Sequence, residues 1–268
     1  MPVRTPHVAG TFYPADPSDL ETFGRTHLRT DALEAPARAV ILPHAGYIYS
    51  GKTACRVLAR VHVPDSVVLI GPNHQGLGAD FAVMTEGEWA TPIGSVPVDE
   101  SLAAELLKTS GFFEEDPEAH RFEHSLEVEV PLLRMKNPAV RIIPFIVGTL
   151  DLESARITAL AIAQRLAAED PPPLLVISTD MNHYESDETT RKKDRFALDA
   201  ILDLNAERLA RAVAAHRISM CGFVPVYMLL VMKEILGFER AELVDYTTSA
   251  EASGDRSRVV GYAGFIIK

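Results

Sequence analysis

Cysteine is scarce in this chain of 268 residues, which contains only Cys55 and Cys221. Two cysteines so far apart cannot build a disulfide framework, so we expect a reducing, cytoplasmic environment. Basic residues are also in the minority, with 26 Lys and Arg against 37 Asp and Glu and a net charge of −11. An acidic surface disfavours contacts with nucleic-acid phosphates or an anionic membrane, so the sequence predicts neither kind of partner.

Long apolar runs are absent as well. The longest, CGFVPVYMLLVM at 221–232, is about half of the ~20 residues that span a bilayer, and two charged residues follow it. The first residues, MPVRTPHVAGTFYPADP, lack the apolar core of a signal peptide. The sequence has neither internal repeats nor low-complexity segments. With hydrophobic residues at 47%, we expect an ordinary globular protein with a single domain over residues 1–268.

Short apolar runs alternate with helical patterns along the chain. Buried strands are predicted at 38–43, 66–72, 141–148 and 174–180, a hairpin at 81–99 with Thr-Pro-Ile-Gly as its turn, and two further strands at 242–249 and 259–268. Helices are predicted at 52–61, 100–110 (capped by Asp99), 152–170, 187–215 and 222–236. This alternation is typical of an α/β protein. We expect three layers, with a mostly parallel, mixed central sheet covered by helices.

Three of the predicted strands are followed closely by an imidazole or a carboxylate. His44 follows AVILP, His74 follows VVLIGPN, and Asp180 and His183 follow LLVIST. Ligands of open α/β sheets bind beyond the carboxyl ends of the strands, so these side chains should converge in one crevice if the strands are parallel neighbours. Such a set supplies metal ligands or acid–base groups. The alternative is that each histidine is an ordinary loop residue, and the coincidence of three strand ends argues against it.

Cys221 precedes the predicted helix at 222–236. A helix N-terminus stabilises a thiolate, which is both the nucleophilic and the metal-binding form. The alternative, equally consistent with the position, is a small apolar residue packed beneath the helix. Cys55 lies inside the predicted helix at 52–61, and we expect it in the core.

The segment RFEHSLEVEVPLL at 121–133 concentrates acidic residues around a histidine. Glu127 and Glu129 are expected on a solvated face, whereas Glu123 and His124 could turn into the crevice. His7 lies in an N-terminal arm that could cover the site. The other histidines stand in helical or polar surface contexts and receive no predicted role: His27, His62, His120 and His216.

Eight short motifs together resemble the Memo family, whose bacterial and archaeal members are also called AmmeMemoRadiSam system protein B. They are VAGTFYP, PHAGYIYSG, GPNH, TPIGSVPVD, EHSLEVEVPLL, STDMNHY, CGFVPV and VGYAGF, and they run through nearly the whole chain in the family's order. The family is similar to the class III extradiol dioxygenases. The resemblance therefore implies the LigB-like dioxygenase fold.

The resemblance also implies a metal site of two histidines and one cysteine. These match His44 in PHAGY, His74 in GPNH and Cys221 in CGFVPV. The related dioxygenases hold non-heme Fe(II) with two histidines and a glutamate, so a cysteine ligand departs from their pattern. Many relatives have a second histidine directly after that of GPNH, where this chain has Gln75.

Two imidazoles and a thiolate suit iron, copper or zinc, and three protein ligands leave an open coordination position. We expect iron or copper before zinc. Asp180 and His183 match residues that line the same pocket in the family. Asp180 is expected to hold an imidazole through its second ring nitrogen. His183 or His124 is expected to act as a general base, and Tyr47 and Tyr184 could hydrogen-bond a ligand.

Three functions are consistent with these residues. The first is a metal-dependent oxidoreductase with dioxygenase-like chemistry on a small, phenolic or related molecule. The cysteine ligand argues against this function. The second is a non-catalytic protein that binds a metal, a ligand or a peptide, because the resemblance implies signalling roles for eukaryotic relatives and a link with a radical-SAM protein. The third and least favoured is metal-assisted hydrolysis by a zinc-bound water. A homo-oligomer is compatible with each.

Overall fold

Nine strands form the central sheet of the computed structural model, which describes residues 2–29 and 34–268. They are β2 (Ala39–Leu42), β3 (Ser66–Pro72), β4 (Phe81–Val83), β7 (Glu114–Glu115), β8 (Arg141–Val147), β9 (Leu174–Ser178), β10 (His183–Glu185), β11 (Ala241–Thr248) and β12 (Val259–Ile267). Their order is β10-β12-β2-β9-β3-β8-β4-β7, and β11 pairs with β12. The six main strands expected from the sequence are therefore present.

The middle of the sheet is parallel. Strand β9 lies between β2 and β3 and is parallel to both, and β3 is parallel to β8. Strands β2 and β9 are buried along their whole length, and β3 and β8 are buried except at their first residues, which are half-buried in β3 and exposed in β8. Helices cover both faces, so these strands are almost continuously apolar rather than alternating. Antiparallel pairs flank this core, β12 with β2 and β4 with β8, which makes the sheet mixed, as predicted.

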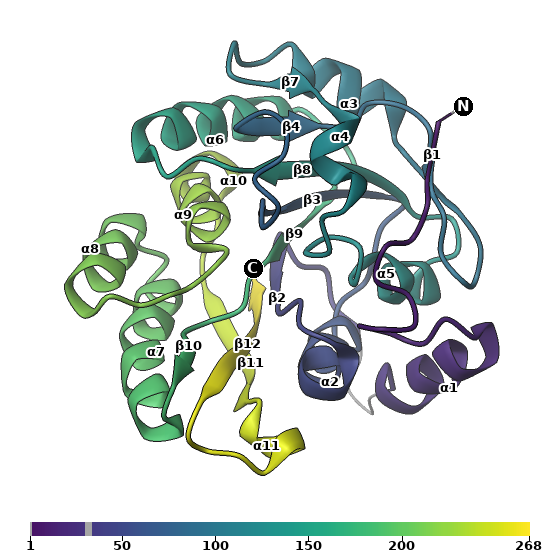
Figure 1. The fold of residues 1–268 in the computed structure, drawn as a ribbon. Coiled ribbons are helices and arrows are strands. Elements are labelled where there is room, and N and C mark those ends of the chain that lie inside the picture. Colours follow the sequence, from purple (N-terminus) through teal and green to yellow (C-terminus); the bar gives the residue numbers. More distant parts are fainter. Residues whose placement is uncertain (1, 30–33) are drawn as a thin grey trace.

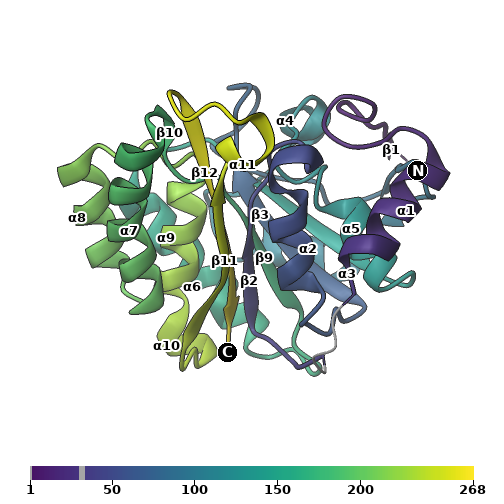
Figure 2. The ribbon, with the colours of Figure 1, turned by 90° about the horizontal axis from the view of Figure 1, so that it is seen from below.

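Helices cover the two faces of the sheet (Figures 1 and 2). One layer contains α1 (Pro17–His27), α2 (Lys52–Leu58) and α5 (Val130–Lys136), and the other contains α6 (Leu152–Leu166), α7 (Asp187–Leu202), α8 (Ala206–His216), α9 (Phe223–Val231) and α10 (Lys233–Leu236). The two layers contact opposite faces of β12. A Cβ on Gly264 would meet Val57 and Thr53 of α2, and one on Gly261 would meet Asp194 of α7. The expected three-layer α/β arrangement is confirmed.

The hairpin expected at 81–99 is shorter than predicted. Only β5 (Glu88–Trp89) and β6 (Val96–Pro97) pair as a hairpin, around a Thr91–Gly94 turn. Strand β1 (Val3–Arg4) joins β5, which makes a separate three-stranded sheet. Residues 81–83 instead belong to the central sheet, because all three are buried and pair with β8. Gly87 separates the two parts at a φ of 92°, where a Cβ would collide with the carbonyl of Pro2.

The predicted helical range 187–215 is interrupted between α7 and α8. Leu204 adopts a left-handed φ of 50°, and the Asn205 side chain accepts a hydrogen bond from Arg208 N at 2.8 Å, which starts the next helix. Asp99 precedes α3 (Glu100–Leu107), but its carboxylate does not cap the helix. It accepts a hydrogen bond from Ser66 Oγ at 2.8 Å instead.

The apolar run at 221–232 becomes α9, which is buried between neighbouring elements. It contacts β9 and β3 on one side and α6 and α8 on the other. Among the described residues, no helix has the length and apolar character needed to cross a membrane. The run is therefore explained by its place in the core.

Candidate metal centre

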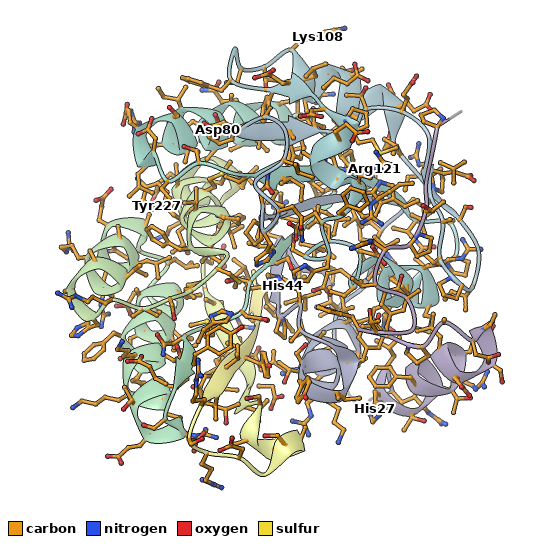
Figure 3. All side chains as sticks on the ribbon, in the orientation of Figure 1. His27, His44, Asp80, Lys108, Arg121 and Tyr227 are labelled. Atoms are coloured by element: carbon orange, nitrogen blue, oxygen red, sulfur yellow. The ribbon has the colours of Figure 1, made fainter. Side chains whose placement is uncertain are left out.

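The carboxyl ends of β2, β9 and β3 lie side by side, and each delivers one of the predicted site residues. His44 follows β2, Asp180 follows β9 and His74 follows β3. Figure 3 looks onto this end of the sheet and places His44 near the middle of it. The adjacency of these strands brings together side chains that are far apart in sequence.

Three side chains present potential metal-binding atoms to one another. The ligand atoms of His44, His74 and Cys221 all lie within 4.8 Å of one another. His44 Nε2 is 3.2 Å from Cys221 Sγ, and the two imidazole centroids are 5.1 Å apart. His44 is buried, Cys221 is partly buried and the His74 side chain is 28% exposed. Solvent therefore reaches the cluster mainly at His74 and in part at Cys221.

The tautomer of His44 follows from its hydrogen bonds. Ser178 Oγ donates to the Ser125 carbonyl at 2.6 Å, so its oxygen accepts from His44 Nδ1–H at 2.7 Å. The lone pair is thereby left on Nε2, which faces the sulfur of Cys221. Burial lowers the pKa of His44 well below its usual range, and the neighbouring imidazoles add to the effect. A neutral imidazole with a lone pair on the nitrogen that faces the site is the form that binds a metal.

Glu123 orients the second histidine. Its carboxylate accepts from the Nδ1 of His74 at 2.8 Å and from the main-chain N of His74 at 2.5 Å. Burial favours the protonated acid, but the hydrogen bond and charge of His74 outweigh it and lower the pKa of Glu123 to about 2. The ionised carboxylate fixes the ring and leaves Nε2 of His74 as its free nitrogen.

Asp180 does not hold an imidazole, so that part of the prediction is wrong. Its carboxylate accepts from the main-chain N of His44 at 2.9 Å, because the side chain turns back toward the neighbouring loop. Burial raises the pKa of Asp180 to about 7. The orienting role expected of it is divided between Ser178, for His44, and Glu123, for His74.

Cys221 lies two residues before α9 begins. Gly222 N donates to Thr179 Oγ1 at 3.0 Å, and Asp180 N points to Cys221 Sγ at 3.2 Å. The N–H that would stabilise a thiolate therefore comes chiefly from the end of β9 rather than from the helix. In the absence of a metal, burial raises the pKa of the Cys221 thiol, and the charge of Asp180 adds to this.

Two further histidines border the cluster. His124 stacks on His74, with ring centroids 4.5 Å apart and an angle of 27° between the planes, and burial lowers its pKa to about 4. His183 Nδ1 donates to the Ser219 carbonyl at 2.7 Å, which leaves its Nε2 unprotonated. Burial also lowers the pKa of His183. Both rings are thus neutral bases at neutral pH.

The acidic segment 121–133 is not the solvated face that we expected. Helix α5 begins only at Val130, and Glu127 and Glu129 are 2% and 1% exposed. Glu127 accepts hydrogen bonds from the main-chain N of His7 and from Tyr13 Oη, so the N-terminal arm covers it. Burial raises the pKa of Glu129 well above its usual value, and the nearby charge of Asp180 adds to this.

Four other residues with an expected place or role can be compared with the structure. Tyr47 is buried and donates to the Val128 carbonyl at 2.7 Å, so it supports the fold rather than a ligand. His120, expected in a helical or polar surface context, lies in a short helix but is fully buried beside Trp89. Cys55 is in the core, as expected. Tyr184 is 65% exposed and adopts a φ of 61° at the irregular pairing of β10 with β12.

Ser178 is the site residue that the sequence interpretation missed. It is the last residue of β9, and in the sequence it belongs to the apolar strand LLVIS. Its polarity within this strand was the only sign of a possible role. Its partner Ser125 lies 53 residues away in the chain. The local pattern did not reveal the role of either serine, because that role depends on which segments the fold places together.

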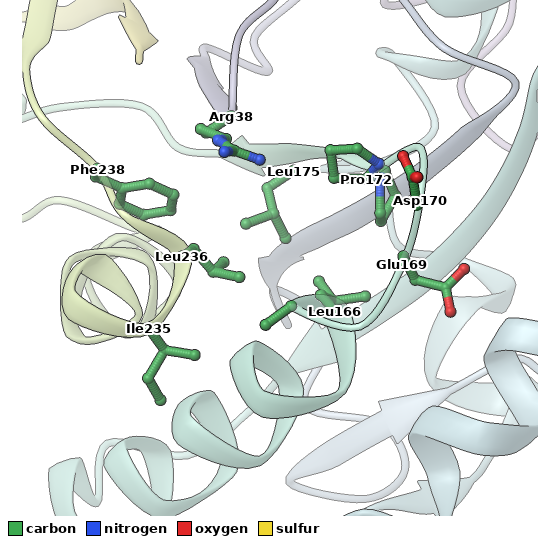
Figure 4. A pocket seen from close by; sticks show the side chains of 11 residues that line it. Arg38, Leu166, Glu169, Asp170, Pro172, Leu175, Ile235, Leu236 and Phe238 are labelled. Atoms are coloured by element: carbon green, nitrogen blue, oxygen red, sulfur yellow. The ribbon is translucent and has the colours of Figure 1, made fainter.

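A separate cavity of about 210 Å³ lies at the opposite, amino end of the sheet (Figure 4). Arg38, which precedes β2, and Leu175 of β9 line it together with the ends of α6 and α10. None of the residues that line it belongs to the histidine–cysteine cluster. The donor set and the strand ends, rather than this cavity, identify the candidate centre.

Comparison with known proteins yields full-length matches. The family described as "Memo-like protein" matches residues 4–266. A "MEMO1 family protein" of Aquifex aeolicus is 41% identical over 268 residues, covering 99% of both chains. Proteins of the same description from Ignicoccus hospitalis and Methanopyrus kandleri are 39% and 37% identical, covering 98% and 99% of both chains, respectively.

Proposed function

The chain belongs to the Memo family, and on that premise we propose that His44, His74 and Cys221 bind one transition-metal ion, iron or copper in preference to zinc. We further propose that this centre performs dioxygenase-like oxidation of a small molecule within a LigB-like fold. The observation that supports it is the approach of two imidazole nitrogens and one sulfur to within 4.8 Å of one another. Such N₂S sets suit iron, copper and zinc and not magnesium or calcium.

The donor set fits a metal ion in its detail as well as its composition. Ser178 and Glu123 bind the Nδ1 atoms of the two histidines, which is the outer-sphere arrangement that metal-binding imidazoles adopt. The N–H of Asp180 lies against the sulfur, where it favours the thiolate. Three protein ligands leave room for a further one, which is typical of reactive rather than structural sites.

A bound iron or copper ion would supply the redox chemistry with O₂ that amino-acid side chains lack. The surrounding residues would handle protons and orientation. His183 and His124 are neutral at pH 7 and are candidates to accept a proton from a substrate hydroxyl. Asp180 would act indirectly, by holding the main chain of His44 and presenting its own N–H to Cys221.

A second candidate is a non-catalytic centre that binds a ligand, a peptide or a protein partner, including one with radical-SAM chemistry or a second copy of the chain. Exposed apolar side chains close in the chain to residues of the site favour it. Ile48, in the short π-helical segment Tyr47–Gly51 that follows His44 in the chain, is 73% exposed, and Tyr184, directly after His183, is 65% exposed. Exposed apolar groups around a site often mark a binding surface.

The test is the metal content of untagged protein purified without oxygen, beside the double variant His74→Ala/Cys221→Ser. We expect about one iron or copper ion per chain in the natural protein and loss of it in the variant. O₂ uptake with candidate phenols would then test catalysis. Stoichiometric zinc would favour hydrolysis, and absence of metal after reconstitution would refute the metal centre and favour partner binding.

A further inference from the structure

We infer that Arg4 is a positioning residue of the metal centre, which fixes the segment that carries Glu123 and thereby holds His74. The inference rests on the proposed metal-binding function. Arg4 lies in β1, far in sequence from every residue of the cluster. It belongs to the N-terminal arm, which we define as residues 2–16.

Arg4 is buried at the junction between the arm and the Glu123 segment, with an exposed fraction of 7%. Its Nε donates to the His120 carbonyl at 2.8 Å, and its Nη2 donates to the Glu123 carbonyl at 2.7 Å. Nη2 also lies 2.8 Å from Glu127 Oε2, and the guanidinium stacks 4.2 Å above the ring of Trp89. A single side chain therefore holds both ends of the short segment from His120, in helix α4 (Pro117–Arg121), to Glu123.

Glu123 links Arg4 to the cluster, because Arg4 binds its main chain and its carboxylate binds His74. Arg4 fixes the main chain of Glu123, and the carboxylate of Glu123 fixes the main-chain N and the Nδ1 of His74. Displacement of the Glu123 backbone would move the carboxylate and release the imidazole. Outer-sphere hydrogen bonds of this kind set the orientation and basicity of a ligating histidine.

Other residues of the N-terminal arm also contact the segments that carry the histidines of the site. Glu127 accepts hydrogen bonds from the main-chain N atoms of His7 and Val8, which anchors the arm beyond Arg4. The Phe12 carbonyl accepts from Tyr47 N at 2.7 Å, close after His44 in the chain. The Phe12 ring lies 4.9 Å from that of His124. The arm thus connects the loop of His44 with the segment of Glu123.

Only arginine can make this set of contacts. Its planar fork donates in several fixed directions, whereas a lysine ammonium offers one compact centre. The pair with Glu127 neutralises a charge that would otherwise be costly to bury. A purely structural ion pair would need only that carboxylate. The two carbonyl contacts at His120 and Glu123 are what connect Arg4 with the centre.

The experiment compares Arg4→Gln and Arg4→Lys with the control Arg134→Gln. Arg134 also donates to main-chain carbonyls, those of Ile93 and Ser95, at 3.0 and 2.7 Å, but it makes no contact with Glu123 or His74. Two quantities are measured in each folded variant. One is the ring-nitrogen NMR signal of His74 in metal-free protein, and the other is the affinity for Zn²⁺ in competition with a chromophoric chelator.

Both Arg4 variants should lose the His74 Nδ1–H signal that marks its hydrogen bond to Glu123 and should bind Zn²⁺ about tenfold more weakly. Arg134→Gln should keep both properties even if it lowers stability to a similar extent. An unchanged His74 signal in Arg4→Gln would overturn the inference. If the Arg4 variants do not fold, Glu127→Gln, which weakens the same anchor, replaces them under the same criteria.

The two proposals fail in different ways. If the natural protein binds no Zn²⁺, iron or copper, the proposed function is refuted, but the His74 signal of metal-free protein still decides the role of Arg4. If the natural protein binds metal and Arg4→Gln leaves both the signal and the affinity unchanged, only the positioning role is refuted.

Discussion

Replacing Glu123 with glutamine removes the charge that orients His74 while keeping the shape of the side chain. The carboxylate accepts from His74 Nδ1 at 2.8 Å and is 1% exposed, so solvent cannot take over its role. Loss of an outer-sphere carboxylate typically weakens metal binding by about 10–100-fold. We therefore expect Glu123→Gln to raise the Kd for Zn²⁺ by that factor.

The same variant has a defined effect on the stability of the metal-free protein. The folded structure lowers the pKa of Glu123 from 4.5 to about 2, chiefly through His74, against the opposing effect of burial. A depressed carboxylate pKa stabilises the fold above pH 4.5, and this contribution is lost as the pH falls from 4.5 to about 2. Its size is roughly 3 kcal/mol in the free energy of unfolding.

Urea denaturation at several pH values measures that contribution. Glu123→Gln should be less stable than the natural protein by roughly 3 kcal/mol at neutral pH, and the difference should shrink as the pH falls toward about 2. The control is Asp99→Asn, which removes a buried carboxylate at the amino end of the sheet and should leave Zn²⁺ affinity unchanged. Equal Zn²⁺ affinity in Glu123→Gln and the natural protein, or a stability difference independent of pH, would refute the reasoning.

Three further predictions follow from the hydrogen bonds and the thiol. Burial raises the pKa of the Cys221 thiol, so a bound metal must displace its proton. The Zn²⁺ affinity, measured by chelator competition, should therefore rise about tenfold per pH unit around neutrality. Cys221→Ser should lose this pH dependence. Ser178→Ala leaves His44 Nδ1–H unpaired, so urea denaturation should show a loss of about 1–3 kcal/mol, with weaker Zn²⁺ binding. Tyr47→Phe should cost about 1 kcal/mol, because the Val128 carbonyl loses its donor, and Zn²⁺ affinity should not change. A large loss of affinity in Tyr47→Phe would show that this hydroxyl contacts the centre after all.

Local sequence predicted the central strands because burial on both faces requires continuous apolar runs, as in AVIL at 39–42 and LLVIS at 174–178. Helix boundaries were predicted less well. The break between α7 and α8 depends on Leu204 in a left-handed conformation, which periodicity does not reveal. The short β4 was assigned to the hairpin because its pairing with β8, more than sixty residues later, is a long-range contact.

His44 and His74 could be identified from the sequence because each stands directly beyond a predicted strand, and parallel strands place such residues at one edge of the sheet. Cys221 was assigned as a ligand through the resemblance to the Memo family, since its position alone was equally consistent with packing. The partners of the two histidines were not predictable in the same way. Which carboxylate or hydroxyl reaches which ring nitrogen depends on the side-chain directions of segments far apart in the chain.

The sequence by itself therefore determined the α/β class, the family and the residue types of the centre, because strand ends and motifs are local features. Only the tertiary structure decided that Ser178 and Glu123, rather than Asp180, orient the imidazoles. It also decided that Glu127 is buried beneath the N-terminal arm with Arg4. The physical reason is that the packing of distant segments, and not the local pattern of residues, determines which polar groups are withdrawn from water and must find one another as partners.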